Sequence, residues 1–319
     1  MDSVIDRLLK LDEPSVRYKV LVNVLKRGKS SSEIEKLQQK IKTSKRVKSL
    51  LSERGKDGKI PYHPYKKWYG AHWVLASLAD IGYPPGDESL IPLREQVYGW
   101  FLSSHHEKSI KTIEGRVRRC ASQEGNAIYY LLALGLADDR TEELARRLIK
   151  WQWSDGGWNC DKNPGAINSS FMESLIPFRA LALHAKATGN TASKITAERS
   201  AEIFLKRRLY KRQRDGRIMR DDFVILHFPC YWHYDILFGL KVMAESGFIS
   251  DERCRDALEL LESKRLPDGG FPAEKKYYQV TEKVKTGRSL VDWGGISKKQ
   301  MNEFMTADTL YVLKEAGRL

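Results

Sequence analysis

Residues 125–158 read GNAIYYLLALGLADDRTEELARRLIKWQWSDGGW, and this stretch holds one complete repeat of the chain. It begins with an apolar helical segment that ends at Gly135, where a left-handed residue is expected to close the helix. A second, more polar segment follows at 139–153, with apolar residues at helical spacing. An Asp-Gly turn at Gly156 ends the unit, because glycine readily takes the positive φ that such turns need. The repeat unit is therefore helix, loop, helix and turn.

The same unit recurs along the whole chain. Apolar helical segments end in glycine at intervals of 54, 53, 54, 58 and 70 residues, at Gly28, Gly82, Gly135, Gly189, Gly247 and Gly317. Polar helical segments follow them near 34–53, 88–104, 139–153, 193–212 and 251–265. Each polar segment ends at a turn signal, namely Asp57-Gly58, Glu114-Gly115, Asp155-Gly156, Asp215-Gly216 or Asp268-Gly269. Repetition at a fixed period indicates a repeat architecture of stacked helical hairpins.

The Gly-ended segments are apolar on nearly every side, as LLALGL, ILFGLKVMA and LIPFRALAL illustrate. A helix of this kind is buried on several sides. We therefore expect an all-α fold, an α/α toroid of about five and a half helical hairpins with the Gly-ended helices as the inner ring. The chain, residues 1–319, is expected to form one such domain, with a basic hairpin at 1–60 at its edge.

Composition limits the class of protein. The chain has 319 residues with 8 Trp, 14 Tyr and 10 Phe, enough aromatic side chains to exclude a disordered chain. No apolar run reaches the length of a membrane helix, and the N-terminus does not read as a secretory signal. The four cysteines are far apart and form no CxxC motif, which favours a reduced, cytoplasmic protein.

The net charge of +14 is concentrated in two segments. Residues 26–67 carry 14 Lys and Arg against 4 acidic residues, and residues 204–220 carry 8 basic residues against Asp215. Such segments are suited to nucleic acid or an anionic surface. A solvated helix face has the same composition. Binding to a polyanion and simple exposure to solvent therefore both remain open interpretations of these segments.

A family resemblance is carried by the stretch Gln152-Trp-Ser-Asp-Gly-Gly-Trp158, with a weaker copy at Leu266-Pro-Asp-Gly-Gly-Phe271. It resembles the Q-x(2–5)-G-x-W motif of the squalene cyclase and prenyltransferase repeat family. The resemblance implies a single α/α toroid with a substrate cavity at its centre and an isoprenoid or polycyclic lipid as substrate. In this motif Gln152 is expected to cap its helix while Trp158 packs over the turn.

Two family motifs are missing. The D-x-D-D acid motif of the cyclases has its nearest match at Met219-Arg-Asp-Asp222, where Met219 replaces the first acid. The zinc-binding Asp-x-Cys of protein prenyltransferases is replaced by Asn159-Cys160-Asp161. We therefore expect no cofactor. A metal site at His227, Cys230 and His233 remains the alternative, although their spacing is not a clean helical chelate.

The segments that lead into the Gly-ended helices carry the polar residues expected to face the cavity. We expect Glu124, Asp161, His233 and Asp235 to act as catalytic acids and bases. We expect the substrate to contact His72, Trp73, Asn126, Cys160, Ser170, Glu173, His227, Cys230, Tyr231 and Trp232. An apolar pocket with a few convergent polar groups is the usual form of a small-molecule site.

The leading hypothesis is thus an enzyme that acts on one small molecule by acid–base cyclisation, isomerisation or elimination. A polyanion-binding module that uses the segments 26–67 and 204–220 is one alternative. A glycan-processing toroid with paired carboxylates is another.

Overall fold

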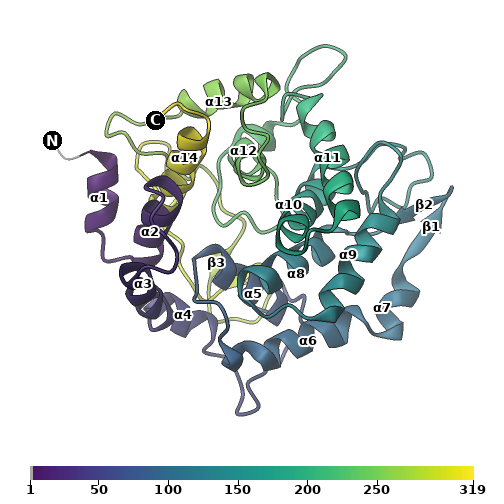
Figure 1. Cartoon of the computed structure of the whole chain (residues 1–319), viewed down its shortest axis with the longest axis horizontal. Helices are drawn as coiled ribbons and strands as arrows, with labels where there is room; N and C mark the ends of the chain where they lie inside the picture. The colour runs from purple at the N-terminus through teal and green to yellow at the C-terminus, as the bar shows by residue number, and fades with distance from the viewer. Residues whose placement is uncertain (1–2) are drawn as a thin grey trace.

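The computed structural model describes residues 3–319, and its helices form a closed ring of two layers (Figure 1). The inner layer consists of α2 (Pro14–Lys19) with the π-helix η1 (Val20–Val24), α5 (Ala71–Asp80), α8 (Ser122–Ala133), α10 (Phe171–Thr188), α12 (Ile236–Glu245) and α14 (Glu303–Glu315). These are the six Gly-ended segments of the sequence, so the all-α toroid and the position of these helices in it are confirmed.

The outer layer consists of the more polar helices. They are α1 (Val4–Lys10), α3 (Ser32–Lys42), α4 (Lys45–Leu50), η2 (Glu88–Leu90) with α6 (Ile91–Phe101), α7 (Ser104–Ser109), α9 (Asp139–Trp151), α11 (Thr191–Leu205) and η4 (Glu252–Cys254) with α13 (Arg255–Glu262). Helix α9 shows why they lie outside: Leu144, Leu148 and Trp151 form a buried stripe, and its charged residues face away. No helix within residues 3–319 has the length and apolarity needed to cross a membrane.

The ring closes between its first and last inner helices. Helix α14 packs against α2 and η1, and the two chain ends lie on the same side of the ring (Figure 1). The Lys19 ammonium of α2 lies 2.9 Å from the Asp308 carboxylate of α14. The N-terminal hairpin, which was expected at the edge of the domain, is therefore part of the ring itself.

The predicted turns form at all five positions, and the glycines at 58, 115, 156, 216 and 269 have positive φ. One predicted helix end is wrong. Gly28 has no positive φ, and Lys26 two residues earlier takes the left-handed conformation instead, with φ of 57°. The glycine that ends the next apolar segment, Gly82, does take the left-handed conformation, with φ of +80°. A Cβ at this position would lie 2.3 Å from the Tyr18 ring of α2. The ring of Tyr18 can lie this close to the end of α5 because position 82 has no side chain.

Gln152 and Trp158 both stabilise the turn after α9. Gln152 was expected to cap the helix, but Trp158 caps it instead. The Trp158 indole N–H donates to the Leu148 carbonyl at 3.0 Å and so caps the helix end. The Gln152 amide donates to the Gly156 carbonyl at 2.8 Å and to the Thr196 carbonyl of α11 at 2.9 Å. Gln152 therefore joins one hairpin to the next.

Two irregular segments were not expected from the sequence. A short antiparallel hairpin, β1 (Lys111–Ile113) and β2 (Arg116–Arg118), stands at the outer rim, paired with Lys111 opposite Arg118. Residues 266–302 carry no helix and only the two-residue parallel strands β3 (Gln279–Val280) and β4 (Arg288–Ser289). This second stretch, which we call the covering segment, crosses the middle of the ring (Figure 1).

The covering segment lies over the ends at which the inner helices begin, which we call the mouth of the ring. The Trp68 indole N–H, just before α5, donates to the Tyr277 carbonyl at 3.0 Å. Arg288 binds Glu53 with two hydrogen bonds of 2.8 Å. His227, ahead of α12, forms a parallel bridge with Lys275.

Candidate active site

Every inner helix contributes one buried or half-buried polar side chain to the centre of the ring. The six residues are Lys19, Asp80, Tyr129, Arg179, Lys241 and Asp308. Together with Glu245, a second residue of α12, they form what we call the channel network. Asp308 lies between two ammonium groups, 2.9 Å from Lys19 and 2.9 Å from Lys241. Arg179 binds Glu245 at 2.6 Å and donates to the Tyr129 hydroxyl at 2.8 Å.

Charges in the channel network balance, with three cations and three carboxylates. Burial alone would raise the pKa of Asp308, but the adjacent Lys19 and Lys241 outweigh it and lower that pKa. The same holds for Asp80, whose pKa is lowered by Lys241, Lys19 and Arg179 against the effect of burial. Both acids are therefore held ionised and serve as counterions, which disfavours them as proton donors.

The space left at the centre is small. A cavity of about 40 Å³ lies beside the channel network, lined among others by Asp80, Asn126, Arg179, Cys230 and Tyr231. Ligand pockets ordinarily measure roughly 300–1,000 Å³. The predicted site residues Asn126, Cys230 and Tyr231 thus do line the centre of the ring, but the room there suits a few water molecules.

A second group of predicted residues meets at the mouth, ahead of α12. We call it the histidine cluster: His227, His233 and Asp235. Helix α12 begins at Ile236, because Asp235 caps it by accepting from the Phe238 amide at 2.8 Å. The residues before Asp235 are therefore free to fold back as a loop over the end of the ring.

Within the histidine cluster, the Asp235 carboxylate holds His227 in place. Its Oδ2 accepts from the His227 backbone amide at 2.9 Å and lies 2.8 Å from His227 Nδ1, without the alignment of a ring hydrogen bond. His227 Nε2 and His233 Nδ1 are buried and lack a hydrogen-bond partner in the described structure. Burial, with the nearby His227, Lys67 and Lys275, lowers the pKa of His233 to about 3, so His233 is neutral at pH 7.

Aromatic rings enclose this cluster. Tyr277 of the covering segment stacks on His233 with ring centres 3.4 Å apart, and Trp232 stacks on its other side at 4.1 Å. Tyr231 stacks on Trp68 at 3.8 Å, and Trp73 meets the Tyr231 ring edge-on. The Trp232 indole nitrogen is also buried without a partner.

The predicted contact His72 lies in an apolar part of the same mouth. It is fully buried, and its Nδ1 lies 3.1 Å from the Tyr130 hydroxyl. Burial, with the charge of Arg119 nearby, lowers the pKa of His72 to about 3. His72 is therefore a neutral imidazole packed among rings, including those of Trp73 and Trp100.

Glu124 begins α8 and is fully buried. It accepts hydrogen bonds from Arg119 at 2.9 Å and His106 at 3.1 Å. Burial would raise the pKa of Glu124, but Arg119 and His106 lower it. This predicted catalytic acid is thus an ion-paired carboxylate.

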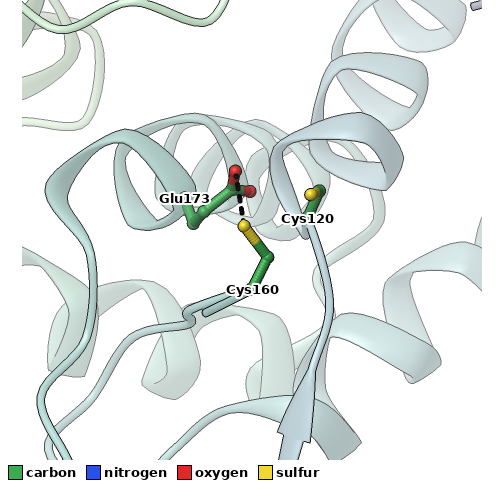
Figure 2. A group of neighbouring side chains, drawn as sticks. All are labelled: Cys120, Cys160 and Glu173. Atoms are coloured by element: carbon green, nitrogen blue, oxygen red, sulfur yellow. Dashed lines mark hydrogen bonds between the residues drawn. The ribbon is translucent and has the colours of Figure 1, made fainter. Parts of the chain in front are cut away.

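Three further side chains meet where α8 and α10 begin: Cys120, Cys160 and Glu173, which we call the thiol–carboxylate cluster (Figure 2). The Cys160 thiol donates to Glu173 Oε1 at 3.6 Å, and the Ser122 amide donates to Glu173 Oε2 at 3.1 Å. Burial raises the pKa of Glu173. The sequence singled out Cys160 and Glu173, but it did not connect them to Cys120.

Two predicted residues lie apart from these groups. Asp161 is exposed on the loop after α9, where its carboxylate accepts from the Asn163 amide at 2.9 Å. It does not meet Glu124, His72 or the histidine cluster, because the loop runs along the surface. Ser170 is the half-buried residue ahead of α10, and its side chain makes no capping bond.

The channel network was the main group that sequence reasoning missed. A signal was present, since Lys241 and Arg179 interrupt the otherwise apolar runs LFGLKVMA and LIPFRALAL. Charges are almost never fully buried unless they are paired. Isolated charges in helices expected to be buried could therefore have been read as partners of one another.

The two basic segments differ in how many of their cations are paired within the described residues: most are paired in residues 204–220, but three of the 14 in residues 26–67, namely Lys26, Lys42 and Arg46, lie beside a carboxylate. In residues 204–220, six of the eight basic side chains lie within 4.0 Å of a carboxylate, as Lys211 does with Asp256 at 2.6 Å. In residues 26–67, Lys42 binds Asp87 at 2.8 Å and Arg46 binds Glu13 at 2.5 Å. These contacts lower the charge that either segment presents to a polyanion.

Comparison with known proteins gives one kind of match. No protein-family model and no curated protein sequence matches the chain. Among solved structures, two variants of type II terpene cyclase MstE from Scytonema, each in complex with the substrate geranylgeranyl dihydroxybenzoate, are similar to it. Each has 13% identity and a TM-score of 0.44, and the match covers 96% of this chain and 88% of the cyclase.

Proposed function

We propose that the chain is an enzyme that acts on one small molecule at the mouth of the ring by general acid–base catalysis in the histidine cluster. The observation that carries this proposal is His227, whose buried Nε2 has no partner while its Nδ1 lies 2.8 Å from Asp235. A buried polar atom without a partner costs about 1–3 kcal/mol, so such an atom calls for an explanation such as a ligand.

The roles follow from this geometry. A carboxylate beside Nδ1 favours the tautomer that carries its proton there, which leaves Nε2 of His227 as the base. Hydrogen bonds in active sites often tighten only when substrate is bound, so the imperfect alignment with Asp235 is compatible with this role. His233 stays neutral at pH 7 and offers Nδ1 as a second polar contact to the substrate.

The aromatic side chains around the histidine cluster favour a largely apolar substrate. Trp68, Trp232 and Tyr277 lie against the two imidazoles, and Tyr231 stacks on Trp68. Aromatic faces also stabilise cationic charge that develops in a reaction. We infer an isoprenoid-like or polycyclic molecule that undergoes isomerisation, elimination or cyclisation by proton transfer. Since Tyr277 now lies against His233, the substrate would take the place of the Tyr277 ring, and the covering segment would move.

A binding experiment tests this function. Calorimetric titration with geraniol, farnesol, geranylgeraniol and a polycyclic sterol should find at least one ligand for the wild-type protein. His227→Ala and His233→Ala should each abolish that binding or weaken it by at least about tenfold, the equivalent of 1.4 kcal/mol. His105→Ala, at an exposed histidine outside the cluster, should bind as the wild type does. The proposal fails if no member of this panel binds, or if His227→Ala and His233→Ala both bind normally.

A further inference from the structure

Outside the histidine cluster, the thiol–carboxylate cluster brings together three potential metal ligands from three parts of the chain (Figure 2). Cys120 comes from the connection between β2 and α8, Cys160 from the loop after α9, and Glu173 from the first turn of α10. Their sulfur and oxygen atoms all lie within 4.8 Å of one another. The fold thus places two thiols and a carboxylate around a common point.

The spacing of these atoms fits a tetrahedral metal ion. Zinc binds sulfur at about 2.3 Å and carboxylate oxygen at about 2.1 Å, so two such ligands on one tetrahedral ion lie about 3.6 Å apart. Cys160 Sγ and Glu173 Oε1 are 3.6 Å apart. The same bond lengths place two sulfur ligands about 3.8 Å apart, within the 4.8 Å spread of the group.

The surroundings position the ligands. The Ser122 amide engages Glu173 Oε2 at 3.1 Å and leaves Oε1 turned to the thiols. The loop that carries Cys160 is held at both ends, since the Arg119 amide donates to the Asn159 carbonyl and the Arg118 guanidinium to the Ala166 carbonyl at 2.7 Å. Metal sites depend on such outer contacts to orient their ligands.

The charge of the three ligands also fits a divalent cation. Two thiolates and a carboxylate carry three negative charges, and a divalent ion would leave one. Arg119, which also binds Glu124 at 2.9 Å, places a positive charge near the remaining negative one.

We propose that Cys120, Cys160 and Glu173 bind one divalent metal ion of the zinc type. Thiolate ligands favour zinc over magnesium or calcium, which prefer oxygen. Three protein ligands leave a fourth position on the ion, and both cysteines are only half-buried, so that position is open to water or a small ligand. This site is separate from the histidine cluster and does not depend on the function proposed for it.

Metal titration of the whole chain tests the proposal without any substrate. The protein is isolated under reducing conditions, stripped with a chelator and titrated with Co²⁺, then with Zn²⁺ in competition. We expect one Co²⁺ per chain, a thiolate-to-cobalt absorption band in the near ultraviolet, and loss of that band as Zn²⁺ displaces Co²⁺. Cys160→Ser and Glu173→Gln should weaken binding by roughly 100-fold or more, since residues that merely orient ligands already contribute roughly 10–100-fold.

The matched control is Cys254→Ser, which alters a buried cysteine outside the cluster and should keep the band and the stoichiometry. Circular dichroism shows whether each variant is folded, and Cys160→Ser is the safest variant because its loop is at the surface. The proposal is overturned if wild-type protein gives no thiolate band, or if folded Cys160→Ser binds Co²⁺ as tightly as wild type.

Discussion

Trp158 shows how a single side chain joins the two layers of the ring. Its side chain is 1% exposed, and its indole N–H caps α9 through the Leu148 carbonyl. Trp158→Ala should lower the free energy of unfolding by about 3–5 kcal/mol, because it leaves a large cavity and an unsatisfied carbonyl. Chemical denaturation measures this. Gln152→Ala, which removes hydrogen bonds without a large cavity, should cost only about 1 kcal/mol, and equal costs for the two variants would contradict this account.

Asp308 is the carboxylate on which two buried lysines depend. Asp308→Asn leaves Lys19 and Lys241 without their shared counterion, and it should destabilise the fold by about 3–5 kcal/mol. Denaturation at pH 7 measures the loss. Asp215→Asn, at an exposed ion pair that solvent screens, should leave the stability nearly unchanged. A similar small effect for Asp308→Asn would mean that the channel network does not hold the ring.

Acid should weaken the fold through the same residue. The pKa of Asp308 is lowered in the folded chain from its ordinary 3.8, so the folded state binds this proton less readily than the unfolded state. Its contribution to stability is present above pH 3.8 and is lost as the pH falls through the lower folded pKa. The free energy of unfolding should therefore drop between about pH 5 and pH 2, and the drop should be smaller in Asp308→Asn. Equal drops in the two proteins would contradict this origin.

Among the elements, the close approach of α2 to the end of α5 depends on Gly82. Gly82 and Gly247 have similar φ, +80° and +82°, but only Gly82 faces another side chain within 4 Å. Gly247→Ala should cost about 1–2 kcal/mol for the left-handed backbone. Gly82→Ala should cost a further 1–3 kcal/mol or so, because its Cβ meets the Tyr18 ring. Thermal unfolding compares the two variants, and equal costs would show that this contact is loose.

Helices and turns were predictable because their signals are local. Each apolar inner helix has its own glycine near its end, and each turn has its Asp-Gly or Glu-Gly pair, so the error at Gly28 was confined to one helix end. The covering segment, residues 266–302, was not predictable. It has no hydrophobic period, and its position is set by contacts with Trp68, Glu53 and His227 from distant parts of the chain.

At the scale of the whole molecule, a closed ring brings together residues that are far apart in sequence. The prediction that the inner-helix starts converge concerns different repeats, so the proximity of His227, His233 and Asp235, which lie within one stretch, does not test it. It could not say which side of an all-apolar helix faces the centre, so the channel network was missed. It also misplaced Asp161, since a loop residue follows no helical period.

The two other functions weighed from the sequence find less support in the whole molecule. In residues 204–220 six of the eight basic side chains already lie beside a carboxylate, so we expect this segment to contribute little to binding of duplex DNA at physiological salt. Fluorescence anisotropy at low and high salt measures it, and tight binding at physiological salt would revive the polyanion hypothesis. For glycan cleavage, Glu124 and Asp235 are both occupied, one by Arg119 and His106 and the other by the start of α12.

Solvent deuterium incorporation is the most direct test of the central claim that the histidine cluster transfers protons. Protein in heavy water is incubated with the ligand that binds most tightly in the calorimetric panel, and the ligand is recovered for mass spectrometry. The account predicts deuterium at a carbon position with wild-type protein and with His105→Ala, and none above the uncatalysed level with His227→Ala. Deuterium incorporation by His227→Ala at the wild-type rate, or none by the wild-type protein, would contradict it.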